Sequence, residues 1–256
     1  MKIAVLVKRV PDTASVFKIA VDGKSVETAN LKYVMSPYDE HAVEEAIKLK
    51  EKNGGEVIIV SVGPSEAKEI IRSGLAMGAD SGLLITGAEA LSPRGLAKVL
   101  AAALKTLAPD VIFAGKQAVD DDAAQVPERV AELLDMPHAS VITRFECLGA
   151  SVVVDREIEG GQYTLELPLP ALLTTQKGIN TPRYPTLPNI MKAKKKEIRE
   201  MSVGELGLAS EALAAGCTVE AFTLPRQERL RKVLEGESIQ KVQELVRILR
   251  ETEKVL

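Results

Sequence analysis

Three turns in the first half of the chain follow apolar runs and carry residues that could hold a phosphorylated ligand: Lys8–Asp12, Gly63–Ser65 and Gly115–Asp122. Glycine lets a ligand approach the backbone closely. Ser65 and Asp122 are suitable N-caps for the helices expected next, whose free amides could bind a phosphate. The turns therefore predict a nucleotide site, although glycine and aspartate at such positions often only lead the chain into a helix.

The three consecutive aspartates, Asp120 to Asp122, would repel a triphosphate unless a metal ion intervened. They suit ribose hydroxyls or helix capping better than phosphoryl transfer. The sequence contains no G-x-x-x-x-G-K-[ST], G-x-G-x-x-G, G-x-S-x-G or H-E-x-x-H motif. We therefore expect no catalytic residue, and a freestanding nucleotide-hydrolysing enzyme is the alternative that the aspartate cluster leaves open.

The remaining residues of reactive type have ordinary structural explanations. His41 and His138 lie far apart in the sequence, and Cys147 and Cys217 lack the C-x-x-C spacing. Packing or surface roles are expected for all four, with no metal site and no disulfide scaffold.

The composition excludes several classes of protein. A net charge of -3 and a pI near 5.7 give no general attraction to polyanions, so no nucleic-acid partner is expected. No apolar run approaches the roughly 18 residues that span a bilayer, so no membrane insertion is expected. The first residues resemble a strand rather than a signal peptide, and we expect a cytoplasmic protein.

Residues 1 to about 145 alternate short apolar runs with stretches of helical periodicity. The runs are Lys2–Val7, Glu56–Val62, Gly82–Ile85 and Asp110–Ala114, and the expected helices are Asp39–Lys52, Ser65–Met77, Pro93–Leu107 and Asp122–Leu134. Strands that are apolar on both faces and alternate with helices are typical of a doubly wound parallel sheet. Ligands bind such sheets beyond the carboxyl ends of the strands, where all three turns should lie.

From Ser140 the pattern changes to consecutive strands, which predicts an antiparallel or mixed extension of the sheet. Asn180–Pro188 holds three prolines and should be a stiff, extended loop. Ile190–Met201 is expected to be a helix carrying a lysine run. After the small-residue segment Gly204–Pro225, apolar residues from Leu230 to Leu249 recur at helical spacing, with a break expected at Gly236.

Long motifs in the second half resemble the β subunit of electron transfer flavoprotein. They are Val154–Gly161, Leu169–Thr174 and Asn180–Lys196, and the similarity continues in Lys8–Val10, Pro37–Ala46, Leu75–Asp80 and Gly115–Asp122. The resemblance implies an α/β fold with a doubly wound parallel sheet of the adenine-nucleotide-binding type, an antiparallel extension and a C-terminal arm. It covers residues 1–200, which form the expected nucleotide-binding domain, and leaves 201–256 as the arm.

The resemblance also implies an electron carrier subunit rather than an enzyme. Such proteins pair with an α subunit that carries FAD and pass electrons from an acyl-CoA dehydrogenase or another flavin dehydrogenase to a quinone reductase or another acceptor. The β subunit holds AMP as a structural ligand, or a second FAD in electron-bifurcating members that use NADH. Bifurcating members often have Gly and Thr where this chain has Asp121 and Ala123, which favours AMP, whereas Val10–Thr13 and Ser36–Asp39 look like bacterial sequences among which bifurcation is frequent.

Nucleotide contacts are implied at the ends of the strands and in the turn after the fourth apolar run. With Gly63 from the turn analysis, the expected contacts are Leu6, Ser36, Pro37, Tyr38, Asp39, Val62, Gly115, Lys116, Gln117, Ala118, Val119, Asp120, Asp121, Asp122, Ala123, Ala124, Gln125 and Val126.

Three further regions are implied to face other proteins. Arg156 and Glu157 are expected at the subunit interface near the flavin of the α subunit, with an exposed strand end as the alternative. A recognition loop, about residues 175–197, is expected to dock on dehydrogenases through Leu187, with Lys192, Lys194, Lys195 and Lys196 steering an acidic partner. Leu187 could instead pack inward. The C-terminal helices are expected to dock on the α subunit, with a last core helix as the alternative.

Overall fold

A computed structural model describes residues 1–88, 91–208, 213, 218–225 and 231–256. Among these residues, nine strands form one sheet in the order β11-β5-β4-β1-β6-β10-β7-β8-β9. The parallel strands are β1 (Lys2–Leu6), β4 (Glu56–Val62), β5 (Ser81–Thr86), β6 (Val111–Gly115), β10 (Ala171–Thr175) and β11 (Ile198–Ser202), together with β7 (His138–Cys147), which is parallel to β10.

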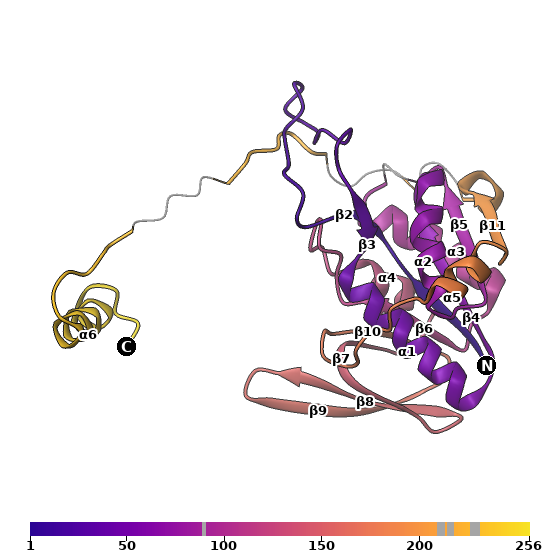
Figure 1. Ribbon diagram of the computed structural model, residues 1–256. Coiled ribbons are helices and arrows are strands. Elements are labelled where there is room, and N and C mark those ends of the chain that lie inside the picture. The colour runs from indigo at the N-terminus through magenta and orange to yellow at the C-terminus, as the bar shows by residue number, and fades with distance from the viewer. Residues whose placement is uncertain (89–90, 209–212, 214–217, 226–230) are drawn as a thin grey trace.

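The antiparallel extension consists of β7, β8 (Ser151–Ile158) and β9 (Gly161–Pro168). It projects from one side of the sheet (Figure 1). A separate two-stranded sheet pairs β2 (Arg9–Pro11) with β3 (Tyr33–Met35) at the base of an excursion that carries a bridge between Ile19 and Val26. The expected fold class, a mainly parallel α/β sheet with an antiparallel extension, is confirmed.

Two layers of helices cover the parallel part of the sheet, with α1 and α2 on one face and α3 and α4 on the other (Figure 1). Their bounds are α1 (Pro37–Asn53), α2 (Lys68–Met77) after the 3₁₀ turn η1 (Ser65–Ala67), α3 (Pro93–Leu107) and α4 (Val126–Leu133). Strand residues alternate between the layers, since Ile3 and Val5 join the core under α1 whereas Ala4 and Leu6 join the core under α3. This double burial explains why the central strands β1, β4 and β6 are largely apolar.

The helix expected from Asp122 begins four residues later, at Val126. Asp122 and Ala124 have φ values of 48° and 46°, in the left-handed region, so the backbone cannot be α-helical there. Pro127 stands in the first turn, where its missing amide costs no hydrogen bond.

The helix expected over Ile190–Met201 is wrong in its second half. Helix α5 covers only Leu187–Ala193, and Ile198–Ser202 forms β11, which pairs in parallel with β5 from Ile198↔Gly82 to Ser202↔Thr86. Of the four lysines, Lys192 alone lies within the helix. The expected domain boundary at residue 200 falls within β11, and the 3₁₀ turn η2 (Val203–Leu206) follows it directly.

The C-terminal segment stands apart from the sheet domain (Figure 1). Helix α6 covers Ser238–Arg247 and continues as a π-helical turn, η4 (Ile248–Thr252). Val233 and Leu234 precede the helix and are not helical, and Leu230 and Cys217 lie outside the described residues. Gly236 has φ 106°, but the described residues directly before it, 231–235, are not helical, so the expected pair of helices separated at Gly236 is not found there.

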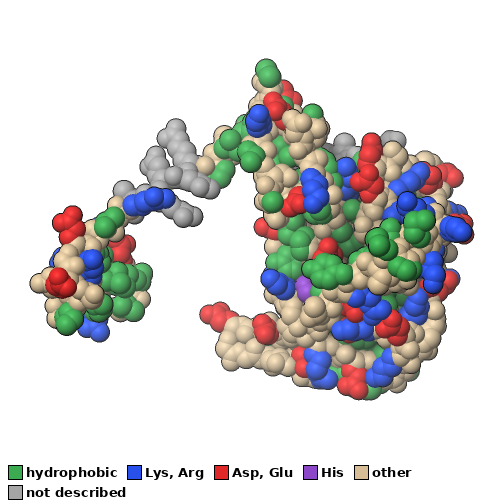
Figure 2. Space-filling view, in the orientation of Figure 1, with side chains coloured by type: hydrophobic (Ala, Val, Ile, Leu, Met, Phe, Trp, Pro, Cys, Tyr) green, Lys and Arg blue, Asp and Glu red, His purple; other side chains and the backbone are tan. Residues whose placement is uncertain are grey.

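Helix α6 buries none of its residues. Hydrophobic side chains gather on this segment (Figure 2), among them Ile239, Val242 and Leu245 on the helix. Helix α6 is therefore not part of the core of this chain. Within the described part of the chain, no helix has both the length and the apolar character needed to cross a membrane.

Candidate functional site

A crevice of ≈370 Å³ opens at the carboxyl ends of β1, β4 and β6. The strand order β5-β4-β1-β6 makes this the point where the chain reverses its direction across the sheet, and doubly wound sheets bind ligands at such a switch point. Leu6, Val60 and Ala114 lie at its strand ends. The predicted location of the ligand site therefore coincides with a real crevice.

Most of the predicted nucleotide contacts line this crevice. They are Leu6, Asp39, Gly115, Gln117, Ala118, Asp120, Asp121, Ala123, Ala124, Gln125, Val126 and Val62. Seven predicted contacts do not line it, namely Ser36, Pro37, Tyr38, Gly63, Lys116, Val119 and Asp122. Pro37 instead lines a second, larger hollow of ≈850 Å³ between α1, α2 and residues 177–185.

The residues outside the crevice support its walls. Ser36 is fully buried, and its backbone amide donates to the carbonyl of Lys8. The ammonium of Lys116 lies 5.0 Å from the centre of the Tyr38 ring, within cation–π range. The carboxylate of Asp122 accepts a hydrogen bond from the amide of Gln117 at 2.7 Å.

The capping roles proposed for Ser65 and Asp122 are wrong. Pro64 precedes the 3₁₀ turn η1, and Ala67 and Gln125 hold the N-cap positions of α2 and α4. The Ser65 hydroxyl lies 3.2 Å from the carboxylate of Glu66 instead. Residue type alone could not show this, because both helices start later than the periodicity indicated.

Asp39 connects the two strands that flank the crevice. One carboxylate oxygen, Oδ2, accepts the backbone amide of Lys8 at 2.7 Å after β1, and Oδ1 accepts that of Gly115 at 3.0 Å at the end of β6. Burial raises the pKa of Asp39 from 3.8 to about 7, against the two amide hydrogen bonds and the Lys8 charge, which lower it. The carboxyl therefore titrates near neutral pH.

Gly115 is required by packing against α1. A Cβ atom at this position would overlap the Asp39 carboxylate and would lie 2.7 Å from Cβ of Tyr38 and 2.8 Å from its carbonyl carbon. Glycine was expected here because a ligand needs access to the backbone, but the closest neighbours are residues of the first turn of α1.

Lys8 neutralises part of the acidic turn. Its ammonium lies 2.8 Å from the carboxylate of Asp120 and 3.1 Å from that of Asp121. Burial lowers the pKa of Lys8, but its hydrogen bonds and charge interactions with the two aspartates outweigh this effect and raise the pKa overall. With Asp39 included, the lining still carries more negative than positive charge.

The opposite wall is apolar and was not predicted. It comes from the start of α3 and the residues before it, through Leu91, Pro93, Leu96 and Leu100. The sequence carried a signal for this wall, because α3 follows β5 and its first turns must therefore lie near the carboxyl edge of the sheet. Lys8 stood in a predicted turn but was not among the expected contacts.

Arg156 and Glu157 lie on β8, opposite Tyr163 and Gln162 of β9. Nε of Arg156 is buried and has no hydrogen-bond partner among the described residues, whereas the Glu157 side chain is exposed. The expectation that they lie near a flavin stays a prediction.

Leu187 is the first residue of α5 and is 79% exposed, so the alternative that it packs inward is wrong. Tyr184, Ile190 and Met191 are also exposed hydrophobic residues nearby. Lys196 differs from the other lysines, because its ammonium donates to the carbonyls of Leu75 and Ala79 of its own domain. The Lys196 ammonium is therefore held by its own domain and does not point freely toward a partner, which argues against a steering role.

The chain is similar in sequence to known proteins. Residues 24–206 match the family described as the electron transfer flavoprotein domain. The electron transfer flavoprotein subunit beta of Bradyrhizobium diazoefficiens is 46% identical over 211 residues, which cover 81% of this chain and 84% of that protein. The subunit of the same name from Bacillus subtilis is 39% identical over 260 residues and covers both chains fully, and that from Homo sapiens is 44% identical over 213 residues, 81% of this chain and 84% of its own.

Proposed function

Because the chain belongs to the electron transfer flavoprotein family, as a β subunit, we propose that it pairs with an FAD-carrying α subunit and holds AMP in the crevice at β1, β4 and β6. As a member of this family it is an electron carrier subunit and not a catalytic enzyme. The observation that carries the AMP assignment is the two-sided lining of the crevice.

The apolar wall from Leu91, Leu96 and Leu100 suits the faces of an adenine ring, which gain free energy from leaving water. The opposite wall offers carboxylate and amide groups from Asp120, Asp121 and Gln125, which suit the hydroxyl groups of a ribose. One flat apolar group and one polyhydroxyl group side by side are the two halves of a nucleoside.

The excess of negative charge in the lining argues against a triphosphate and against phosphoryl transfer. A single phosphate is better placed toward the backbone amides at the start of α4, which have no partner within the helix. Lys8 reduces the repulsion by pairing with Asp120 and Asp121.

The size of the crevice favours AMP over a second FAD. A volume of ≈370 Å³ lies near the lower end of the range of ligand sites, about 300–1,000 Å³. FAD contains an AMP half and a flavin mononucleotide half, so it would need about twice the space. The bifurcating alternative, in which NADH reduces a second FAD, requires that the crevice widen.

When bound in the heterodimer, FAD accepts and donates the electrons that the complex carries. We propose that Arg156 and Glu157 face it, since the guanidinium of Arg156 has a buried Nε without a described partner. The recognition loop docks on a flavin dehydrogenase, such as an acyl-CoA dehydrogenase, in the cytoplasm, and the reduced complex passes its electrons to a quinone reductase or another acceptor.

The direct test is to count the cofactors of the purified heterodimer after denaturing extraction. AMP as the structural ligand predicts one flavin and one AMP per heterodimer, whereas a bifurcating protein would release two flavins and no AMP. Turnover of ATP by the chain alone would support the hydrolytic alternative.

A matched pair of variants tests the position of the site. Lys8→Met should lower the AMP retained by the heterodimer, because two aspartates then face the ligand without their cation. Lys32→Met removes an ion pair with Asp12 that lies on the exposed excursion, and it should leave the AMP content unchanged. Equal AMP contents in the two variants would place the nucleotide elsewhere.

A further inference from the structure

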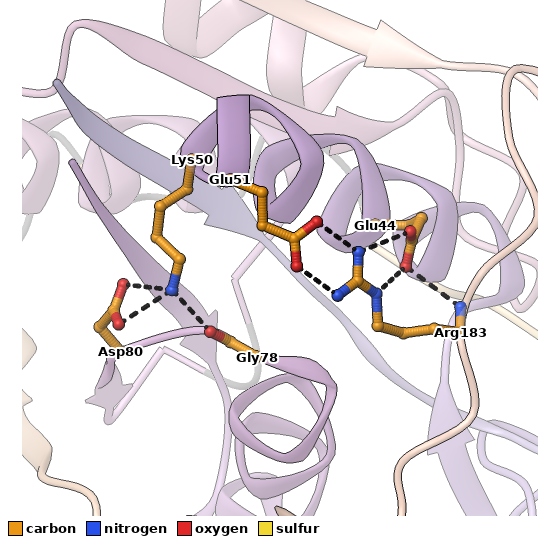
Figure 3. Close-up of polar contacts among 6 residues, drawn as sticks. All are labelled: Glu44, Lys50, Glu51, Gly78, Asp80 and Arg183. Atoms are coloured by element: carbon orange, nitrogen blue, oxygen red, sulfur yellow. Dashed lines mark hydrogen bonds and ion pairs between the residues drawn. The ribbon is translucent and has the colours of Figure 1, made fainter. Parts of the chain in front are cut away.

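The recognition loop, residues 175–197, is held to α1 by a cluster of charged side chains (Figure 3). The Arg183 guanidinium bonds both oxygens of Glu44, at 2.9 and 3.1 Å, and both oxygens of Glu51, at 2.6 and 3.0 Å. The backbone amide of Arg183 donates to Glu44 as well, at 3.1 Å. Glu44 and Glu51 lie seven residues apart, two helical turns, so both face the same side of α1.

The uncharged side chain of Asn180 adds hydrogen bonds to the same helix. Its side-chain amide donates to the carbonyl of His41 and to the carboxylate of Glu45, both at 2.9 Å, and its oxygen lies 3.0 Å from Nδ1 of His41. The first half of the loop is therefore fixed to α1 at two points on either side of Pro182.

The second half of the loop is fixed to α2 by reciprocal hydrogen bonds, in which a cationic side chain from each segment donates to backbone carbonyls of the other. The Arg72 guanidinium of α2 donates to the carbonyls of Ala193 and Lys196, and the Lys196 ammonium donates back to the carbonyls of Leu75 and Ala79. The loop is thus attached at both ends to neighbouring helices of the domain.

Between these attachments the loop presents exposed apolar side chains. Tyr184 is 94% exposed, Leu187 79% and Met191 61%. Helix α5, with seven residues, is too short to be stable by itself. The conformation in which Leu187 is presented must therefore depend on the attachments and on the flanking prolines.

We propose that Arg183 is a positioning residue for partner recognition, which fixes the recognition loop so that Leu187 and its apolar neighbours are ordered before a dehydrogenase binds. The inference rests on the proposed function of the loop. An ordered segment loses less conformational entropy on binding than a flexible one, so the attachment should improve affinity without touching the partner.

The chemistry of the cluster explains why arginine stands at position 183. The Glu44 side chain is 4% exposed, and a carboxylate with so little access to water requires a charged partner. A planar guanidinium can bond two carboxylates at once through its fork of N–H groups, whereas an ammonium is a point charge without that geometry. Hydrogen bonding from Arg183 also lowers the pKa of Glu51, so the pair stays ionised at neutral pH.

The first experiment measures order in the loop of the heterodimer by hydrogen exchange. In Arg183→Gln, the amides of Ile190 and Lys194, which bond Thr186 and Ile190 in α5, should exchange at least tenfold faster than in the wild type. Arg183→Lys should lie between the two. Glu51→Gln breaks only the exposed half of the cluster and serves if Arg183→Gln does not fold.

Lys50→Gln is the matched control. Lys50 also lies on α1 and bonds Asp80 and the carbonyl of Gly78 (Figure 3); among the described residues it makes no hydrogen bond to the loop, where its charge acts on Lys196 through space. Its loss should leave the exchange of Ile190 and Lys194 unchanged. If Arg183→Gln changes these amides no more than Lys50→Gln does, the positioning role is refuted.

The second experiment uses a purified acyl-CoA dehydrogenase that reduces the wild-type heterodimer. Arg183→Gln should raise KM for the heterodimer about tenfold, with kcat, the flavin potential and reduction by a small dye unchanged. An unchanged KM despite faster exchange would also refute the proposal.

Leu187→Ala separates this inference from the proposed docking function. It should raise KM without altering exchange in α5. If Leu187→Ala leaves KM unchanged, the docking surface is wrong, whereas the exchange data still decide whether Arg183 orders the loop.

Discussion

Replacing Gly115 by alanine tests whether the crevice depends on close packing between the end of β6 and the start of α1. The added Cβ would overlap the Asp39 carboxylate and approach Cβ and the carbonyl carbon of Tyr38 to 2.7 and 2.8 Å. Carbon atoms in ordinary contact lie about 3.5–4.0 Å apart. The first turn of α1 must therefore move away from β6 by about 0.7–1.3 Å.

The cost of this movement has two parts. Overpacking a core by one carbon typically costs about 1–3 kcal/mol. The shift also lengthens the 3.0 Å hydrogen bond between the Gly115 amide and the Asp39 carboxylate beyond hydrogen-bond range, and above pH 7, where Asp39 is ionised, a bond to a charged group contributes about 1.5–3 kcal/mol. We expect Gly115→Ala to lower the free energy of unfolding by about 3–5 kcal/mol.

Urea unfolding of the purified heterodimer measures this loss. With a slope of about 3 kcal/mol per molar urea for a domain of this size, the midpoint should fall by about 1–1.7 M. Gly63→Ala is the matched control, because Gly63 directly follows β4, which lies on the other side of β1 from β6, and its added Cβ would meet only Cβ of Ala67, at 3.2 Å. We expect the control to lose less than about 1 kcal/mol. If both variants unfold at the same urea concentration, packing against α1 does not explain the glycine at position 115.

Three further predictions concern charge and assembly. Since the pKa of Asp39 is raised to about 7 in the folded protein, its contribution to the free energy of unfolding is full below pH 3.8 and is lost as the pH rises through 7, by up to about 4 kcal/mol. Asp39→Asn should remove this part of the pH dependence of urea unfolding. Equal pH dependences in the variant and the wild type would contradict the prediction. Glu157→Gln should make the flavin easier to reduce, by about 40 mV for a charge about 10 Å away at an effective dielectric constant of about 40. Spectroelectrochemical titration measures this shift, and an unchanged potential would show that Glu157 lies far from the cofactor. Truncation before Pro225 should leave a folded domain, because α6 buries no residue, but it should abolish co-purification with the α subunit. A truncated chain that still co-purifies would show that the helix is not needed for assembly.

The regular elements of the sheet domain could be predicted because their pattern of apolar and polar residues follows directly from which side chains are buried. Glu56–Val62 and Pro93–Leu107 have the predicted bounds, since a strand buried on both faces is apolar throughout and an amphipathic helix keeps its period to its ends. Strand β11 was missed because its sequence, IREMS, is largely polar. It lies at the edge of the sheet, where only part of each face is covered.

The site was predictable to the extent that it follows from topology. The carboxyl ends of parallel strands must meet at one edge, so Leu6, Val62 and Gly115 could be brought together from their positions in the strands. The left-handed backbone at Asp122 and Ala124 could not be anticipated, because neither residue type requires it. The contacts of Arg183 and Lys196 with α1 and α2 also could not be derived, since they join residues more than a hundred positions apart.

The order of the strands has a consequence for how the chain folds during its synthesis. Strand β10 pairs with both β6 and β7, yet it is made after the whole antiparallel extension. Until Ala171–Thr175 has left the ribosome, β7 has no strand partner in the parallel sheet, and the side of β6 away from β1 offers unpaired backbone groups to other chains. The turn after β6 also depends on β10, because the backbone amide of Lys116 donates to the carbonyl of Thr175. The turn that lines the crevice thus gains this backbone contact only when β10 is inserted.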